Sequence, residues 1–529
     1  MALAGTAYRR LAYGPGEPRM VRNDLAADRS PSGGTPMSLL YLAQITDFQL
    51  ADSQSPARFE FLEQLRGRRG AEAYLPTWRP QELLVPQAVS AMVDTLNRLP
   101  PSAETGAPLG MCISTGDSLD NAQLNELGWF LTLLAGGTLA PNSGAGFYEG
   151  VQSGDWGQEL YWRPEGGPDQ FKDAFGFPAH PGLLADAMRP FLAPGLAVPW
   201  LSCFGNHDGL VMGTAIPTPE YQRLLAGGEK PTDLAPGVDP LALVAEFTSH
   251  PELFLTGPAR QVTPDPDRRS VGRREFVEAH LAAGGLPTGH GFDRSNLSAE
   301  TTYGVFDVDG PVPIRVILLD TTNMDGDWQG SLGVRQLRWL EDKLTEVHGR
   351  YFDSQGRLVA TGTRDRVVVL ASHHGLVSMV NLGHDPSGLE PDQPRVTATA
   401  CRSLLHRFPN VVCWLNGHRH RNDIQPRPDP AGRTAGFWEI ATSAIADWPC
   451  QSRLVELALD GRGGLTIFST MLDAAAPADP ERAEGVERLA ALHRELALNY
   501  PAPSFVAHSA GKSGDRNVAL RLPVPFPVK

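Results

Sequence analysis

Five short segments of this 529-residue chain place acidic, amide or imidazole side chains directly after an apolar run that is typical of a buried strand. An α/β sheet collects such loops along the carboxyl edge of its strands, where ligands bind. Carboxylates together with neutral imidazoles suit a divalent ion such as manganese, zinc or iron(II). The pattern therefore predicts a metal centre, with two ions. The segments are Asp47-Phe48-Gln49, Gly116-Asp117-Ser118-Leu119-Asp120-Asn121, Gly205-Asn206-His207-Asp208, Ser372-His373-His374-Gly375 and Gly417-His418-Arg419-His420.

The order of these motifs resembles that of the calcineurin-like metallophosphoesterase superfamily. In this chain the order is Asp-x-Gln, Gly-Asp-x-x-Asp, Gly-Asn-His-Asp, His and Gly-His-x-His, and the resemblance spans Asp47 to His420. It implies an α/β protein with the calcineurin-like metallophosphoesterase fold, a two-sheet β-sandwich flanked by helices, here with long cap insertions. It also implies a metal-dependent phosphohydrolase that acts on a small phosphorylated substrate.

The resemblance implies a set of metal ligands that share two ions, with Asp117 bridging them. One ion would take Asp47, Gln49, Asp117 and His420, and the other would take Asp117, Asn206, His373 and His418. Two ions about 3.5–4 Å apart neutralise the charge of a phosphate ester and lower the pKa of a water molecule between them. The family pattern His-x-Gly selects His373 as a ligand over His374.

The same resemblance implies roles in catalysis and substrate binding. His207 would contact the phosphate, together with Asn206, and protonate the leaving oxygen. Asp120 would pair with His207 and hold its tautomer, with Asp208 as a second option, and helix capping stays open for both acids. His374 would contact substrate or stack within its loop. Arg419 and His384 could contact phosphate, but we favour the interpretation that both are solvated surface residues.

Gln49 departs from the commonest pattern, which has histidine at that position. An amide oxygen is a harder ligand than imidazole, so it favours manganese or magnesium over zinc or iron. We therefore expect two divalent ions, with Mn²⁺ first and Fe, Zn or Mg as alternatives. The loop ITDFQLADSQS is similar to that of manganese-dependent ADP-ribose/CDP-alcohol diphosphatases, which raises nucleotide-diphosphate-type substrates as an option.

Composition narrows the classes of partner. The net charge of −14 argues against a nucleic-acid or anionic-membrane surface, which needs basic patches. The five cysteines are widely spaced and four lie in or beside apolar runs, which indicates buried thiols. We find neither the apolar core of a signal peptide nor a membrane-length apolar run, so a cytoplasmic enzyme is expected.

Along the chain we expect an N-terminal arm (1–37), a metallophosphoesterase domain (38–475) with insertions at about 136–199 and 209–301, and a C-terminal helix and tail (476–529). Alternating strands and helices in the first half, with a helix at Leu84–Leu99, predict a parallel sheet. Three further strands, at Gly436–Ala446, Arg453–Ala458 and Leu465–Met471, are expected to be antiparallel and to close the second sheet. Both insertions are interpreted as walls of the substrate cleft, with surface decoration or an oligomer contact as the alternatives.

Two functions compete. The first is a phosphohydrolase that cleaves a phosphomonoester or phosphodiester. The second is a catalytically weak metal-binding or scaffold protein on the same fold, in which Gln49 marks a degraded site. The other predicted ligands are all present, which argues against degradation, and the acidic charge argues against a nuclease.

Overall fold

The computed structural model describes residues 7–26, 35–68, 75–239, 246, 250–384, 388–460 and 464–528. Parts of the predicted arm (1–6 and 27–34) and of the second insertion (240–245 and 247–249) therefore lie outside the described residues. All residues of the five sequence motifs lie within them.

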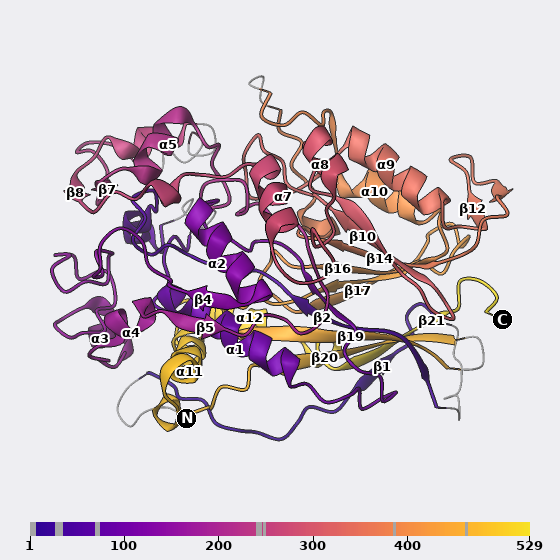
Figure 1. Ribbon diagram of the computed structural model, residues 1–529, viewed down its shortest axis with the longest axis horizontal. Helices are drawn as coiled ribbons and strands as arrows, with labels where there is room; N and C mark the ends of the chain where they lie inside the picture. The colour runs from indigo at the N-terminus through magenta and orange to yellow at the C-terminus, as the bar shows by residue number, and fades with distance from the viewer. Residues whose placement is uncertain are drawn as a thin grey trace.

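Two β-sheets form the centre of the molecule and lie one above the other in Figure 1. The seven-stranded sheet has the order β1 (Met20–Arg22), β21 (Val518–Pro523), β20 (Gly464–Asp473), β19 (Gln451–Leu459), β2 (Met37–Ile45), β3 (Met111–Ser114) and β6 (Trp200–Ser202). The six-stranded sheet has the order β17 (Asp423–Arg427), β18 (Phe437–Ala441), β16 (Val411–Asn416), β14 (Val367–Ser372), β10 (Ile314–Leu319) and β9 (Gly304–Val308).

The main core lies between the two sheets. Leu42 and Ile113 of the seven-stranded sheet share one buried cluster with Val316 and Val369 of the six-stranded sheet. Every residue of β10, β14 and β16 is buried, which explains why these strands are continuous apolar runs in the sequence. Helices cover the outer faces, so the predicted α/β sandwich flanked by helices is confirmed.

Different helices cover the two outer faces. Helices α1 (Val85–Asn97), α2 (Leu124–Ala135) and α7 (Arg273–Ala282) pack against the seven-stranded sheet, and α11 (Gly485–Leu498) packs along α1. Helices α9 (Val334–Thr345) and α10 (Ala398–Leu405) cover the six-stranded sheet and lie above it in Figure 1. The predicted helix at Leu84–Leu99 corresponds to α1.

Parallel strands bring the five motifs together. Strands β2, β3 and β6 are parallel, and so are β10, β14, β16 and β18. Each motif directly follows one strand, β2, β3, β6, β14 or β16. The carboxyl ends of these strands therefore supply the whole candidate site, as the sequence predicts.

The prediction for the last strands is wrong in part. Strand β18 does belong to the six-stranded sheet, but it lies parallel to β16. Strands β19 and β20 belong to the other sheet, where β19 pairs antiparallel with β2. The connection 442–450 crosses between the sheets, and apolar periodicity does not reveal such a crossing because both sheets bury the same kinds of residue.

Both terminal segments add to the sandwich. Strand β1, from the predicted arm, pairs in parallel with β21, from the predicted tail, and β21 pairs with β20. A short helix, α12 (Pro503–Ser509), precedes β21. The sequence analysis did not predict either terminal strand, because both are short and flanked by proline.

The two insertions carry small elements that pack against other parts of the chain. The first carries β4 (Gly137–Leu139), α3 (Gln170–Phe175), α4 (Leu183–Met188) and β5 (Phe191–Ala193). Its buried aromatics, including Trp156 and Trp162, pack with Trp78 and with leucines of α11. The second carries α5 (Pro219–Ala226), β7 (Glu229–Pro231), β8 (Ala259–Gln261), α7 and α8 (Arg294–Ala299), and its start packs against residues 57–65.

The remaining strands form two small two-stranded sheets outside the sandwich. They are β11 (Leu332–Gly333) with β15 (Arg395–Val396), and β12 (Arg350–Phe352) with β13 (Leu358–Ala360).

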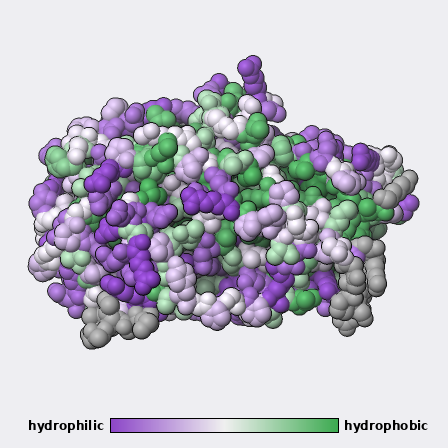
Figure 2. All heavy atoms as spheres, turned by 60° about the horizontal axis from the view of Figure 1, so that its bottom comes forward, coloured by the Kyte–Doolittle hydropathy of each residue, from purple (hydrophilic) through white to green (hydrophobic). Residues whose placement is uncertain are grey.

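The face in Figure 2 mixes hydrophilic and hydrophobic residues, in keeping with the composition. All five cysteines are buried free thiols, as predicted. Within the described part of the chain, none of the helices has the length and hydrophobicity that crossing a bilayer requires.

Candidate metal centre

The seven predicted ligands come together at the carboxyl edge of the two sheets, and most of them have an unusual backbone conformation. Five of the seven have positive φ: Asp47 (51°), Gln49 (43°), Asp117 (53°), His418 (70°) and His420 (47°). A non-glycine residue in this left-handed region costs about 1–3 kcal/mol, and such residues cluster at functional sites. The fold therefore tolerates strain at the positions that aim these side chains.

Asp117 lies at the middle of the cluster. Its Oδ2 is 3.0 Å from Nε2 of His373, and its Oδ1 accepts a hydrogen bond from the backbone N–H of His207 at 2.9 Å. Nδ1 of His373 donates to the carbonyl oxygen of Thr115 at 3.0 Å, so Nε2 is the nitrogen left for a ligand. Asp117 thus contacts two of the other motifs, as a bridging carboxylate must.

The buried carboxylate of Asp208 holds the Gly-Asp loop in place. It accepts hydrogen bonds from the backbone N–H groups of Gly205 (2.7 Å), Asp117 (3.0 Å), Ser118 (2.9 Å) and Leu119 (3.0 Å). Asp208 therefore fixes the loop that carries Asp117 and makes no contact with the ring of His207. Of the two roles that the sequence left open for Asp208, orienting His207 or capping backbone N–H groups, these contacts are closer to capping.

Asp47 connects the first motif to the last one. Its carboxylate accepts from the backbone N–H of His418 at 3.1 Å, and its Oδ1 lies 3.3 Å from Nε2 of His420. His420 donates from Nδ1 to Oδ2 of Asp447 at 2.6 Å. The His418 ring lies beside that of His373, with Nδ1 of His418 and Nε2 of His373 3.3 Å apart.

Three predicted ligands have buried polar atoms without a hydrogen-bond partner among the described residues: Oε1 of Gln49, Oδ1 of Asn206 and Nε2 of His418. Asn206 uses its Nδ2 to donate to the carbonyl of Gly213 at 2.9 Å, which leaves its oxygen facing the site. A buried acceptor without a partner costs about 1–3 kcal/mol. Oxygen and imidazole nitrogen acceptors are what a divalent ion binds, so these residues fit a metal centre.

The donor atoms are close enough to share ions. Two groups each have ligand atoms within 4.8 Å of one another: Asp47, Asp117 and His373, and His373, His374 and His418. The two groups share His373. This proximity supports a metal position at Asp47, Asp117 and His373, although the sequence pattern assigns Asp47 and His373 to different ions.

The electrostatics of the cluster favour cations. Burial alone would lower the pKa of His373, but Asp117 and Asp47 raise it to about 9. Burial would also lower the pKa of His420, but Asp47 and Asp447 raise it to about 10. Burial would raise the pKa of Asp117, yet His373 and His207 hold it well below its usual range. The carboxylates therefore attract positive charge, which a metal ion supplies in place of these protons.

His207 and Asp120 are neighbours, but the contact differs from the simple pairing expected. Nδ1 of His207 lies 2.6 Å from the backbone carbonyl of Asp120, whereas the Asp120 carboxylate is 3.9 Å away. That carboxylate instead accepts from Nη1 of Arg58 at 2.5 Å, and Arg58 also donates to Glu82 at 2.7 Å. The carbonyl accepts a hydrogen bond from Nδ1 and leaves Nε2 for the cleft.

His374 is occupied by protein partners on both ring nitrogens. Nδ1 lies 2.8 Å from the Thr321 hydroxyl, and Nε2 donates to the carbonyl of Trp328 at 3.0 Å. Burial lowers the pKa of His374 to about 3. Of the two adjacent histidines, His373 therefore has the geometry of a ligand, and His374 has that of a loop-stabilising residue.

Sequence reasoning missed two residues that support the site. Asp447, which orients His420, also pairs with Arg79 at 2.9 Å, and Arg58 binds Asp120. Asp447 follows strand β18 outside the five motifs, and no motif surrounds Arg58. The useful signal for Asp447 was an acid in the loop after another parallel strand, β18.

A cleft of about 320 Å³ opens above the centre. Met212 and Thr214, from the start of the second insertion, line it, but none of the lining residues belongs to 136–199. The prediction that the first insertion walls the cleft is therefore wrong, because its aromatics pack on α11 instead. The other lining residues are Gln49, Arg58, Leu75, Pro76, Thr77, Arg79, Asp117, Asp120, Asn206, His207, Trp328, His418, Arg419, His420 and Phe505.

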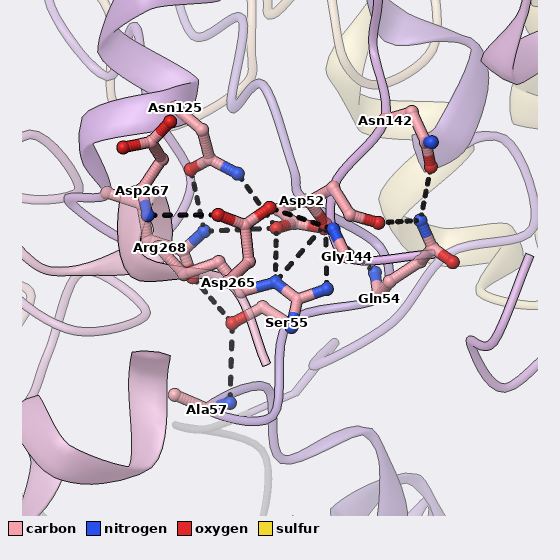
Figure 3. Close-up of polar contacts among 12 residues, drawn as sticks. Asp52, Gln54, Ser55, Ala57, Asn125, Asn142, Gly144, Asp265, Asp267 and Arg268 are labelled. Atoms are coloured by element: carbon pink, nitrogen blue, oxygen red, sulfur yellow. Dashed lines mark hydrogen bonds and ion pairs between the residues drawn. The ribbon is translucent and has the colours of Figure 1, made fainter. Parts of the chain in front are cut away.

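The loop that carries Arg58 is fixed to both insertions by buried polar contacts, shown in Figure 3. Nε of Arg268 is 3.0 Å from Oδ2 of Asp52, and Asn125 donates to the same carboxylate at 2.8 Å. Gln54 donates to Oδ1 of Asn142 at 2.7 Å. Both Arg268 and Asp52 are almost fully buried, so this pair holds the second insertion against the loop that follows β2.

Comparison with known proteins gives matches among solved structures alone. No protein-family model matches the chain, and no curated protein matches it. A dimetal phosphatase from Danio rerio superposes with a TM-score of 0.35 at 10% identity, over 83% of this chain and 100% of that one. A purple acid phosphatase from yellow lupin superposes with a TM-score of 0.30 at 10% identity, over 83% of this chain and 52% of that one. GAP50, the anchor in the inner membrane complex of Plasmodium, superposes with a TM-score of 0.27 at 8% identity, over 82% of this chain and 85% of that one. Because these superpositions are loose, the functional argument rests on the site itself.

Proposed function

We propose that this protein is a metal-dependent phosphohydrolase of the calcineurin-like type, which uses two divalent ions to cleave a phosphomonoester or phosphodiester bond. One observation carries the proposal. Predicted ligands from four of the five loops line one cleft, and His373 of the remaining loop contacts Asp117 at 3.0 Å. Three of these ligands present buried acceptor atoms without a partner among the described residues. An apolar or fully hydrogen-bonded floor would be expected of a structural cleft.

The residues have distinct tasks in this proposal. Asp47, Gln49, Asp117, Asn206, His373, His418 and His420 would hold the ions. When bound, divalent ions neutralise the charge of the phosphoryl group and activate water as a nucleophile. The amide oxygen of Gln49 favours Mn²⁺ over softer ions.

His207 stands apart from this set and is the proposed general acid. Its Nδ1 is fixed by the Asp120 carbonyl at 2.6 Å, and its side chain is 18% exposed at the edge of the cleft. When the ring carries a second proton on Nε2, that nitrogen can protonate a leaving oxygen above the centre, while Arg58 and Asp120 hold the loop that positions the ring.

A scaffold protein with a degraded site is the less favoured alternative. Gln49 replaces the usual histidine, but its Oε1 is buried, unpartnered and on the cleft wall. A glutamine that had lost its role would be expected to find a hydrogen-bond partner or solvent.

A substrate panel with controlled metal content tests the proposal. Metal-free protein should be assayed with 4-nitrophenyl phosphate, bis(4-nitrophenyl) phosphate and a nucleoside diphosphate ester, after adding back Mn²⁺, Mg²⁺, Zn²⁺ or Fe²⁺ singly. We expect hydrolysis of at least one ester that depends on added metal and is abolished by Asp117→Asn. Asp353→Asn, a carboxylate in the turn between β12 and β13, is the matched control and should retain activity. Metal-loaded protein that hydrolyses none of these esters would reject the proposal.

A further inference from the structure

Three arginines line the cleft, and they differ in how many hydrogen bonds and ion pairs their guanidinium groups make with other residues. Arg58 donates from both terminal nitrogens, to Asp120, Glu82 and the Thr77 carbonyl. Arg79 pairs with Asp447 through Nε alone, at 2.9 Å. Arg419 is exposed and has no ion pair or hydrogen bond from its side chain to any residue that the structure describes.

The positions of Arg79 and Arg419 relative to the centre are related. Arg419 stands between His418 and His420, and the positive φ of both neighbours fixes its backbone at the edge of the cleft. Arg79 reaches the same side of the cleft through Asp447, which binds the ring of His420. Its side chain is 11% exposed, and its two terminal nitrogens form no hydrogen bond to described residues.

The charge balance indicates what these groups are for. The carboxylates of Asp47 and Asp117 belong to the proposed ions. Asp120, Glu82 and Glu60 pair with Arg58, and Asp447 pairs with Arg79. The guanidinium of Arg419 and the terminal nitrogens of Arg79 form no hydrogen bond to a described residue, so they remain available as donors in the cleft. Guanidinium groups bind phosphate and carboxylate oxygens with paired hydrogen bonds.

We propose that Arg79 and Arg419 form a second anion subsite, so that the preferred substrate is a phosphoric ester carrying a second anionic group besides the phosphoryl group that is cleaved. This proposal rests on the proposed function. The subsite adjoins His420, because Arg419 directly precedes this histidine and Asp447 links it to Arg79. It binds the part of the substrate that does not react, so its loss should raise KM more than it lowers kcat.

The test uses pairs of substrates that differ only in the second anion. Butane-1,4-diol bisphosphate and 4-carboxybutyl phosphate are compared with butane-1,4-diol monophosphate, by phosphate release from Mn²⁺-loaded enzyme. We expect wild type to prefer the substrates with two anionic groups. Arg419→Gln should lower kcat/KM for these about tenfold or more, through KM, and leave the monophosphate unchanged. Arg419→Lys should restore part of the loss.

Control variants separate the subsite from general effects of charge. Arg402→Gln removes an exposed arginine of α10 that does not line the cleft, and it should change neither substrate. Equal losses on both substrate types in Arg419→Gln, or no loss on either, would overturn the second anion subsite. Wild type that fails to hydrolyse even the monophosphate and the nitrophenyl esters would instead reject the proposed function, so the two failures are distinguishable.

Discussion

The ring of His420 is held by Asp447, whose Oδ2 accepts a hydrogen bond from Nδ1 at 2.6 Å. This contact fixes the tautomer and aims Nε2 at Asp47, 3.3 Å away. Carboxylates that orient a ligand histidine in this way typically contribute 10–100-fold to metal affinity.

Asp447→Ala should therefore weaken binding of Mn²⁺ by about 10–100-fold, because the His420 ring loses its orientation. Competition with a fluorescent chelator measures the dissociation constant. Asp447→Asn keeps the shape and one acceptor oxygen, so it should lie between wild type and alanine. Unchanged affinity in a folded Asp447→Ala protein would show that His420 does not need this contact to bind metal.

Gln49→His should shift the metal preference from manganese toward zinc and iron, because imidazole is a softer ligand than an amide oxygen. The measurement is the activity of metal-free protein titrated separately with each ion. Gln425→His, on strand β17, introduces the same side chain elsewhere and serves as the control. If wild type and Gln49→His show the same order and affinity of metals, Gln49 is not a ligand.

His207→Ala should reduce kcat by about 10²–10⁴-fold for esters of poor leaving groups, since no acid protonates the departing oxygen. Nitrophenyl esters need little protonation, so their loss should be much smaller. Rates for a series of esters that differ in leaving-group pKa test this directly. An equal loss across the series would instead assign His207 to phosphate binding.

Arg268→Gln should destabilise the protein by about 3–5 kcal/mol, because it leaves the buried carboxylate of Asp52 without its ion-pair partner. Arg260→Gln removes an exposed pair with Asp155 and should cost less than about 1 kcal/mol. Denaturant unfolding of both variants gives the comparison. Similar stability of the two variants would mean that the buried pair does not lock the second insertion in place.

The strand-end loops could be predicted from sequence because each buried parallel strand is a continuous apolar run and each motif follows directly. Strands β2, β14 and β16 start and end close to where the pattern places them. Strand β1 could not be predicted because it has three residues and its partner β21 lies at the other end of the chain. Strand β21 was missed because it lies in a proline-rich segment that resembles a tail.

The sequence allowed the candidate ligands of the site to be predicted, but it did not reveal the contacts that support them. The convergence of Asp117 with His373 follows from motif order, whereas the pairing of Arg58 with Asp120 depends on how a loop folds back. The family pattern selects His373 over His374 as a ligand, but the role of His374 in its own loop became visible only through the partners of its ring. Contacts between distant loops have no periodic signature in the sequence.

The number of metal ions bound per chain tests the central claim most directly. Metal-free wild type and Asp117→Asn should be dialysed to equilibrium against Mn²⁺, and bound metal measured by elemental analysis alongside protein concentration. The account predicts two ions per wild-type chain and fewer in Asp117→Asn, because that variant weakens the carboxylate that bridges both positions. A folded wild-type protein that binds no divalent ion, whether manganese, magnesium, zinc or iron, would contradict it.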